Sequence, residues 1–562
     1  MFEATTERRY LAPFKAVRLT QQVTDVLVIG GGVAGLRAAI AAADEGVDVM
    51  VITKGPLQES NTWYAQGGVA AALNPPDNFK SHIADTINAG GGLCDLNAVE
   101  ITIREGSQRV LELLLWGAEF DKDSHQAHNL AFGLEAGHSF PRIVHAHGDA
   151  TGRAIAETLI KCVGSRDTIR VASSSFVLDL LTDEGRCVGA MAMLDGKLQI
   201  IWAKRVILAT GGAGMLYRET SNPRIATADG PAMAWRAGAT LQDMEMVQFH
   251  PTTLYVAGSN RTLVTEAVRG EGAYLVDRNG YRFMPDYHER AELAPRDVVS
   301  QSIVKQIRKT NYSHVFLDVR HLPMEKFRKR FPTLAALVDQ FDIDMSKDLI
   351  PIHPAAHYMI GGVDVDEMGR TSVAGLYAVG EASCTGLHGA NRLGSNSLLE
   401  GLVYGARAGA DAAQGAKKND IKFPQNLEHK VPESSRTDLD ITDVRSSLRA
   451  LMWRNVGIER TADRLSETRE IITFWSRYVM DKVFDPAKGD AGAVAGWELQ
   501  NLLTAATLVT AAAYARTESR GAHQRTDYPE RDDQHWRQHL LWRRSMETPM
   551  PEPVIDRKED SR

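Results

Sequence analysis

Cysteine is scarce in this 562-residue chain, and the four cysteines present stand far apart, with no C-x-x-C pair among them. They are Cys94, Cys162, Cys187 and Cys384. Isolated cysteines supply neither the paired thiolates of a zinc or iron–sulfur site nor a disulfide framework. We therefore expect no metal site, and we expect the protein to work in a reducing compartment, the cytoplasm.

A long apolar run is also missing. The longest weakly polar stretch, Leu502 to Ala515, is interrupted by threonines and is shorter than the roughly 20 apolar residues that a membrane span needs. It is expected to form a core helix, and we expect no membrane partner. The residues before Thr24 contain no apolar segment of the signal-peptide kind, and Glu3 and Glu7 argue against an organellar transit peptide.

The chain has no excess of basic residues either, because 64 Lys and Arg stand against 71 Asp and Glu, a net charge of -7. Proteins that bind nucleic acids usually carry a basic surface, so we expect no nucleic-acid partner. The length exceeds what one hydrophobic core normally serves. It predicts about two to four domains and room for a large cofactor.

A dinucleotide-binding pattern lies near the N-terminus. Asp25–Ile29 is a short apolar run, Gly30–Gly35 reads G-x-G-x-x-G, Leu36–Glu45 is rich in alanine, and Val47–Thr53 is a second apolar run. This order predicts a strand, a helix and a strand, with glycines that let a pyrophosphate approach the backbone at the helix N-terminus. The same motif alone is weak, and a glycine-rich structural turn is the alternative.

The end of the second predicted strand bears on which dinucleotide binds. A nicotinamide site expects an acidic residue about 20 residues after the glycines, on the ribose hydroxyls. Here the chain has Thr53 and Lys54. The missing carboxylate disfavours NAD, and Lys54 offers a cation to a phosphate or a ribose, which favours FAD.

Later segments complete the domain plan. Arg205–Gly212 and Gly375–Glu381 are further strand patterns, so one sheet is expected to assemble from distant segments. Between them the chain turns polar, and Asp277–Gly280 predicts a type I′ hairpin turn. We expect an α/β fold, with a Rossmann-like FAD-binding domain, an inserted α+β capping domain, a C-terminal helical domain and a mobile tail. The predicted ranges are 1–246 with 355–425, then 247–354, 426–545 and 546–562.

Two motifs carry a family resemblance. His388–Glu400 sets Arg392 between a glycine turn and a small polar stretch that opens an apolar helix, a segment suited to hold an anionic substrate against a cofactor. Ser60–Gly68, which reads SNTWYAQGG, lies upstream. With both, the sequence resembles the succinate dehydrogenase/fumarate reductase flavoprotein family, and within it the L-aspartate oxidases.

The resemblance implies a FAD site with Gln66 and the two following glycines against the isoalloxazine and Glu381 on the ribityl chain. Asn61 stands where members of the membrane complexes carry a histidine bonded covalently to FAD, so non-covalent FAD is expected. Asp229 is placed on the flavin side, with helix capping as the alternative. The expected cofactor-binding residues are Gly30, Gly32, Val33, Ala34, Gly35, Lys54, Ser60, Asn61, Thr62, Ala65, Gln66, Gly67, Gly68, Asp229, Glu381, Ser397 and Leu398.

The resemblance also implies a dicarboxylate site. Arg392 is expected as the bidentate carboxylate clamp and His250 and His357 on carboxylate oxygens, because charge-assisted hydrogen bonds offset the cost of desolvating two charges. Arg296 resembles the family's proton-transfer arginine, although a guanidinium is a poor base. Asp297 is either its structural partner or a catalytic group.

Aspartate differs from succinate by its α-ammonium, for which a carboxylate is the natural partner. Glu135 stands in a segment similar to the aspartate oxidase pattern and is expected to contact the ammonium. A solvated loop carboxylate is the alternative.

The reaction that the resemblance implies is hydride transfer from Cα of L-aspartate to flavin N5. It would give iminoaspartate, pass electrons to oxygen or fumarate, and begin de novo NAD synthesis, with transient contact to quinolinate synthase and a monomeric enzyme. A soluble fumarate reductase or a succinate dehydrogenase flavoprotein subunit is the alternative, disfavoured by Asn61 and Glu135. A flavin-dependent tRNA-binding protein is disfavoured by the acidic charge balance.

Overall fold

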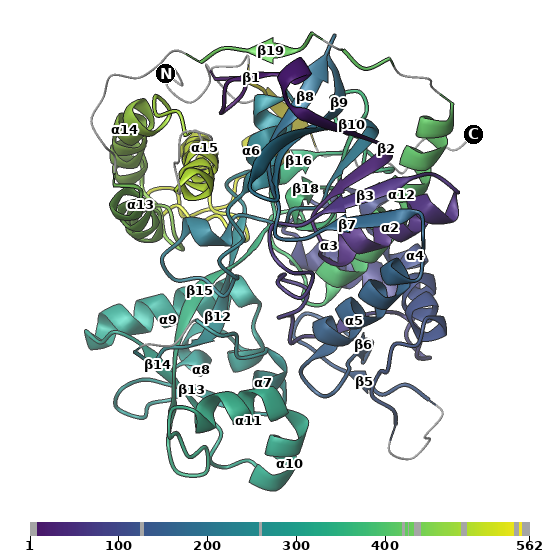
Figure 1. Cartoon of the computed structure of the whole chain (residues 1–562). Helices are drawn as coiled ribbons and strands as arrows, with labels where there is room; N and C mark the ends of the chain where they lie inside the picture. Colours follow the sequence, from purple (N-terminus) through teal and green to yellow (C-terminus); the bar gives the residue numbers. More distant parts are fainter. Residues whose placement is uncertain are drawn as a thin grey trace.

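The computed structural model describes residues 8–123, 129–257, 261–418, 422–424, 426–431, 440–484, 492–544 and 550–553 (Figure 1). A central sheet of seven strands occupies the upper half of the view. Its path is β7-β3-β2-β10-β9-β8, and β17 also pairs with β10. The strands are β2 (Thr20–Ile29), β3 (Val49–Ile52), β7 (Ile169–Ala172), β8 (Phe176–Asp183), β9 (Arg186–Leu194), β10 (Lys197–Leu208) and β17 (Leu376–Ala378).

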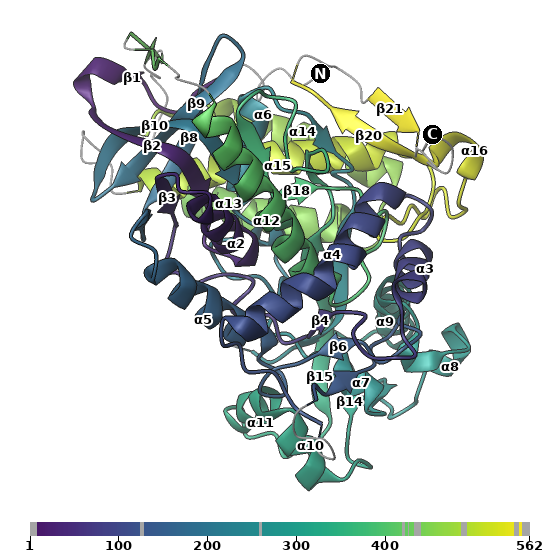
Figure 2. The ribbon, with the colours of Figure 1, turned by 90° about the vertical axis from the view of Figure 1, so that its right-hand side faces the viewer.

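The expectation of one sheet from distant segments is confirmed, because β10 pairs in parallel with both β2 and β17. The predicted βαβ unit is confirmed as well, with α2 (Val33–Asp44) between β2 and β3. Helix α12 (Asn396–Lys417) packs on α2 so closely that a Cβ at Gly409 would lie 2.2 Å from the Ala38 carbonyl oxygen. Figure 2 shows α12 and α2 side by side below the sheet.

Further helices and short strands surround this layer. The helices are α3 (Phe79–Ala89), α4 (Leu96–Leu115), α5 (Thr151–Gly164) and α6 (Asp229–Arg236). A small sheet pairs β6 (Ile143–Val144) with both β4 (Val69–Ala70) and β5 (Phe132–Gly133). The strands β1 (Phe14–Lys15) and β19 (Glu428–His429) pair with each other.

A second unit hangs below the sheet in Figure 1 and has its own apolar core. Its antiparallel sheet has the order β12-β15-β14-β13. The strands are β12 (Val247–Leu254), β13 (Tyr274–Val276), β14 (Val315–Asp318) and β15 (Ile350–Met359), and the helices are α7 (Ala267–Gly270), α8 (Met284–Tyr287), α9 (Arg296–Thr310), α10 (Met324–Arg330) and α11 (Pro332–Asp339). In chain order β12 is the first strand of this unit and β15 the last, and these two connect it to the rest of the chain.

The type I′ turn predicted at Asp277–Gly280 is wrong. The amide of Gly280 does donate to the Asp277 carbonyl at 2.9 Å, but of these residues only Gly280 has a positive φ, +78°. A type I′ turn requires positive φ at both central residues. The Asp277 carboxylate instead accepts from the amides of Asn279 and Tyr281, which holds the turn in another conformation.

The C-terminal region contains α13 (Ile441–Asn455), α14 (Ala462–Val479), α15 (Ala493–Ala515) and α16 (Asp533–Trp536). Helix α15 is buried over most of its length, which confirms the predicted core helix at Leu502–Ala515. A five-stranded sheet joins this region to the middle of the chain through β11 (Leu241–Gln242), β16 (Gly362–Asp364), β18 (Ser383–Cys384), β20 (Gln538–Trp542) and β21 (Met550–Pro553). Of the predicted tail, residues 550–553 thus form a strand, and the others lie outside the described residues.

Among the described helices, none combines the length and the apolar character needed to cross a bilayer.

Candidate functional site

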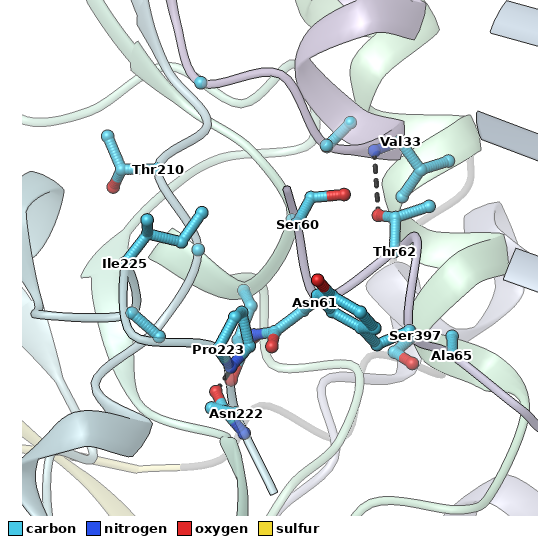
Figure 3. Close-up of a pocket in the computed structure, with 18 of the residues that line it drawn as sticks. Val33, Ser60, Asn61, Thr62, Ala65, Thr210, Asn222, Pro223, Ile225 and Ser397 are labelled. Carbon is cyan, nitrogen blue, oxygen red and sulfur yellow. Dashed lines mark hydrogen bonds between the residues drawn. The ribbon is translucent and has the colours of Figure 1, made fainter. Parts of the chain in front are cut away.

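One long cavity runs from the glycine turn after β2 to the interface between the central sheet and the β12–β15 unit. All the cofactor and catalytic residues expected from the sequence line it, except Gly35. The carboxyl ends of the parallel strands β2, β3, β10 and β17 open toward this cavity, the usual position of a ligand in such sheets. Figure 3 shows the part of the wall around Asn61.

The glycine turn explains the exception. Gly35 lies one helical turn inside α2, where an added Cβ would lie 2.1 Å from the Gly30 carbonyl oxygen. At Gly30, with φ +121°, a Cβ would lie 2.0 Å from the carbonyl oxygen of Ala209, which directly follows the neighbouring strand β10. The glycines therefore allow strand, turn and helix to approach closely. The Val33 amide donates to Thr62 Oγ1 at 3.0 Å, shown in Figure 3, which ties the SNTWYAQGG segment to the helix N-terminus.

Lys54 does not present a free cation at the far end of the cavity. Its Nζ lies 2.9 Å from Asp229 and 2.5 Å from Glu498, a residue of α15. We expected Lys54 to face a phosphate or a ribose, whereas these two carboxylates already neutralise it. Glu498 had no sequence signal, because it lies more than 400 positions away in another region.

Asp229 is not a helix cap. The N-cap of α6 is Ala228 in a left-handed conformation, and no side chain caps the helix. The Asp229 carboxylate instead accepts from Lys54 and from Asn501 Nδ2 at 2.8 Å. The capping alternative was therefore wrong.

The middle of the cavity is held by an amide–carboxylate network. Asn61 Nδ2 donates to Asn222 Oδ1 and Glu381 Oε2, both at 2.9 Å, and the amide of Met359 donates to Glu381 Oε1. Burial raises the pKa of Glu381. Figure 3 shows Asn61 and Asn222 side by side.

These residues fit a FAD molecule. The close backbone approach at the glycine turn suits a pyrophosphate, and the N-terminus of α2 favours negative charge there. Gln66 Oε1 is buried without a hydrogen-bond partner in the described part of the chain, so it is available to a donor on a bound ring system. Gly67 leaves that wall open, because a Cβ there would touch nothing nearer than 3.7 Å.

Five predicted catalytic residues meet at the other end of the cavity. His250 comes from β12, His357 from β15, Arg296 from the first turn of α9, Arg392 from the loop before α12, and Glu135 from the loop after β5. The rings of His250 and His357 lie 5.1 Å apart, edge to face. The group thus combines side chains from both sides of the interface.

Gln248 connects the two arginines. Its Oε1 accepts from Arg392 Nη1 at 3.1 Å and from Arg296 Nη1 at 3.4 Å, and its Nε2 donates to the Arg392 carbonyl. The guanidinium of Arg392 also lies over the ring of Tyr358, 4.6 Å from its centroid. These contacts hold two guanidinium groups next to each other in a buried site.

The electrostatics follow from this crowding. Burial, and then the charge of Arg296, lowers the pKa of Arg392 to about 10. Burial and neighbouring arginines also hold the pKa values of His250 and His357 well below the usual imidazole range. The site therefore presents two guanidinium cations and two neutral imidazoles, a set suited to two carboxylates.

Glu135 is the buried carboxylate of this group, with 4% exposure, so the solvated-loop alternative was wrong. Burial acts to raise its pKa, but His145, Arg296 and a hydrogen bond from Ser395 outweigh burial and bring the pKa to about 2. Ser395 Oγ donates to Oε2 at 2.7 Å, while Oε1 has no hydrogen-bond partner among the described residues. A buried anion with one open oxygen can bind a cation.

The carboxylate that binds Arg296 is not Asp297, its expected structural partner. Arg296 Nε donates to Glu266, which also lines the cavity. Asp297 instead accepts from Asn391 at 3.1 Å, and burial raises its pKa to about 6. Asp297 follows Arg296 directly on α9, and successive helix residues point in different directions. Glu266 had no motif around it that marked it in the sequence.

No group of three or more His, Cys, Asp or Glu in the described ranges could hold a metal ion.

The sequence and the fold are similar to those of known flavoproteins. Residues 25–398 match the family described as FAD binding domain, and residues 445–558 match fumarate reductase flavoprotein C-term. An L-aspartate oxidase of Streptomyces coelicolor is 44% identical over 533 residues, covering 92% of this chain and 91% of that protein. A chloroplastic L-aspartate oxidase of Arabidopsis thaliana is 41% identical over 549 residues, covering 92% and 83%. A solved quinol fumarate reductase chain of E. coli superposes with a TM-score of 0.88 at 32% identity, covering 97% of this chain and 99% of that one.

Proposed function

Because the chain belongs to the succinate dehydrogenase/fumarate reductase flavoprotein family, and within it to the L-aspartate oxidases, we propose that it oxidises L-aspartate to iminoaspartate on a non-covalently bound FAD. The observation that supports this most is the buried Glu135 carboxylate beside two arginines and two neutral histidines. L-aspartate carries two carboxylates and one ammonium. The site offers a matching set of charges.

The arrangement suggests how the substrate is bound. Arg392 holds one carboxylate with two parallel hydrogen bonds, and the neutral imidazoles of His250 and His357 donate to carboxylate oxygens. Glu135 binds the α-ammonium. Gly394 leaves room for this, because a Cβ there would lie 2.8 Å from Arg296 Nη2 and 3.0 Å from Glu135 Oε2.

FAD supplies the acceptor for the hydride that leaves Cα. The residues of this chain orient the substrate so that its Cα–H bond faces the cofactor. Arg296, held by Glu266, stabilises carboxylate charge and does not act as a base. His250 and Arg296 belong to the proposed capping domain, so its closure would exclude water and strengthen these contacts.

We also propose three domains: an FAD-binding domain at 1–246 and 355–425, a capping domain at 247–354 and a helical domain at 426–545. The site supports it, because side chains of both first domains meet there. We further propose that oxygen or fumarate takes the electrons, and that a monomer works in the cytoplasm. The unstable imine would pass to quinolinate synthase in de novo NAD synthesis.

The alternative is a fumarate reductase or a succinate dehydrogenase flavoprotein. The structural similarity to the E. coli chain supports this alternative. Asn61 and Glu135 disfavour it. A buried carboxylate repels a substrate that has two carboxylates and no ammonium.

Anaerobic flavin bleaching tests the function. L-aspartate is expected to bleach the visible absorbance of the purified holoenzyme, while D-aspartate and succinate leave it unchanged, because only L-aspartate places its ammonium at Glu135 with Cα–H toward the flavin. Spectra recorded before and after each addition decide this. Bleaching by succinate and not by L-aspartate would move the chain to the dicarboxylate dehydrogenases.

Release of the cofactor tests the proposed non-covalent linkage. Denaturation with acid, followed by filtration, is expected to leave the yellow colour in the filtrate and colourless protein in the retentate. The reason is that Asn61 carries an amide engaged with Asn222 and Glu381, and an amide does not form the flavin bond that a histidine forms. Flavin fluorescence that stays with the denatured chain on a gel would contradict this.

A further inference from the structure

Behind Glu135, on the side away from the cavity, lies a histidine that no motif marked. His145 follows β6, which pairs with β5, and β5 leads into the loop that carries Glu135. Its side chain is buried, with 4% of the residue exposed. His145 does not line the cavity. Its polar contact with the cavity wall is the one with Glu135, which does line the cavity.

Two glycines keep the imidazole in place. A Cβ at Gly133 would lie 2.7 Å from His145 Cε1, and a Cβ at Gly68 would lie 3.2 Å from its Cδ2. The ring is thus packed between two backbone segments that accept no side chain on that face. Gly68 belongs to the segment expected against the flavin, so the histidine is tied to the cofactor wall.

The polar atoms of the pair face each other. His145 Nε2 and Glu135 Oε1 are 3.6 Å apart, and neither has a hydrogen-bond partner among the described residues. Two buried polar atoms without partners are costly unless a ligand or a small shift completes them. Glu135 Oε2 is already bound by Ser395, which leaves Oε1 between the histidine and the substrate.

We propose that Glu135 and His145 form a dyad in which His145, acting through Glu135, accepts the proton that the α-ammonium must lose before hydride transfer. This inference rests on the proposed function. It makes His145 a positioning and proton-accepting residue and Glu135 the group that touches the substrate.

The step balances in atoms and charge. One N–H bond of the ammonium breaks, its electron pair stays on nitrogen, and the proton moves by way of the carboxylate to His145, which becomes an imidazolium beside the Glu135 anion. With FAD bound, the neutral amine would release the Cα–H as a hydride, two electrons and a proton, for which the flavin would be the acceptor. The nitrogen lone pair forms the C=N bond of the protonated imine.

Other groups near the substrate are poorer proton acceptors. Arg296 and Arg392 are cations, and a guanidinium is not a base in proteins. His250 and His357 lie beside those cations, and burial with the same charges keeps both imidazoles neutral. The carboxylate of Glu135 holds the proton only in passing, because Arg296 and the hydrogen bond from Ser395 favour its ionised form.

The charged and titratable groups that act on Glu135 come from several elements. They are His145, Arg296, Arg392, Arg269 and His138. The charge of a protonated His145 favours the ionised carboxylate most, and the three arginines favour it as well. Of these groups, the two histidines are the candidates for a proton acceptor. Both ring nitrogens of His138 already have partners, the Gly394 carbonyl and Arg142, which leaves His145.

The test compares His145→Asn with His147→Asn. His147 is exposed two positions further along, and asparagine tolerates its positive φ of 50°. Anaerobic flavin reduction by saturating L-aspartate is followed by stopped flow and expressed per bound flavin, from about pH 6 to about pH 9. His145→Asn is expected to react roughly 10²-fold more slowly at neutral pH, while His147→Asn matches the wild type.

The pH profile separates a proton acceptor from a packing role. Without His145 only substrate that has already lost its proton reacts, so the rate of the variant should rise about tenfold per pH unit toward the amine pKa. In the wild type, the same rise of the rate with pH should occur at lower pH than in the variant. His145→Phe, which fills the space without a nitrogen, should behave like His145→Asn. Wild-type rates and profiles in both variants would overturn the dyad.

A measurement on the wild type covers the case in which neither variant holds flavin. With a pH indicator in weak buffer, no proton should be released during flavin reduction, because the dyad retains it. Release of one proton per flavin in that phase would overturn the inference. If L-aspartate does not bleach the wild-type flavin at all, the proposed function fails, which is a distinct result from equal rates in the variants.

Discussion

Replacing Arg392 with leucine is expected to lower kcat/KM for L-aspartate by roughly 10²- to 10⁴-fold. The guanidinium is buried at the substrate end, where Nη1 donates to Gln248 Oε1 and Nε has no hydrogen-bond partner in the described chain. A substrate carboxylate would satisfy such donors through charge-assisted hydrogen bonds, each contributing about 1.5–3 kcal/mol. Leucine fills part of the space and offers no donor.

Steady-state kinetics with L-aspartate measure the effect, and Arg392→Lys is the matched control. Lysine keeps the positive charge but has no planar pair of donors, so its loss should be intermediate. The absorbance of bound flavin shows whether either variant still holds the cofactor. A leucine variant within about threefold of the wild type would mean that another group holds the carboxylate.

The same substitution should not destabilise the protein. Burial and the charge of Arg296 already lower the pKa of Arg392 to about 10, which shows that the folded state disfavours this cation. Removing one of two adjacent buried cations relieves that cost, as at many active sites where function and stability oppose each other. A thermal melt of the holoenzyme is expected to show an unchanged or higher Tm. A marked decrease would indicate that Arg392 has mainly a structural role.

Local patterns predicted the nucleotide-binding core well. The apolar run of Asp25–Ile29, the glycines and the alanine-rich segment after them determine a strand, a turn and a helix through contacts within a few residues of each other. Glycine is required at positions 30 and 35, because an added Cβ there would lie about 2 Å from neighbouring backbone atoms. Such local requirements can be recognised in the sequence.

Side-chain contacts between segments far apart in the sequence could not be predicted in this way. Arg296 binds Glu266 and not its neighbour Asp297, and Lys54 binds Glu498 of a distant helix. Both outcomes depend on how the loops of separate units meet, which no local spacing records. The contact of His145 with Glu135 was not predicted for a further reason. It depends on the antiparallel pairing of two strands of two residues each, β5 and β6.

The charges at the substrate end explain why one carboxylate matters so much. Two guanidiniums and two neutral imidazoles alone would suit succinate or fumarate as well as aspartate. Glu135 adds a negative charge where only aspartate brings a positive one. Discrimination between these substrates therefore depends on a repulsion as much as on an attraction.

Glu135→Gln is accordingly expected to slow flavin reduction by L-aspartate by roughly 10²-fold or more, while oxidation of the chemically reduced flavin by fumarate is retained or becomes faster. The carboxylate has a pKa of about 2 and is an anion at neutral pH, so it favours the ammonium and opposes a dicarboxylate. Glutamine has nearly the same shape and keeps an acceptor for Ser395, but it has no charge. Stopped-flow rates of both half-reactions on one preparation measure the change, and the fumarate reaction controls for folding and flavin content. Equal losses in both reactions would show that Glu135 holds the loop in place and does not choose the substrate.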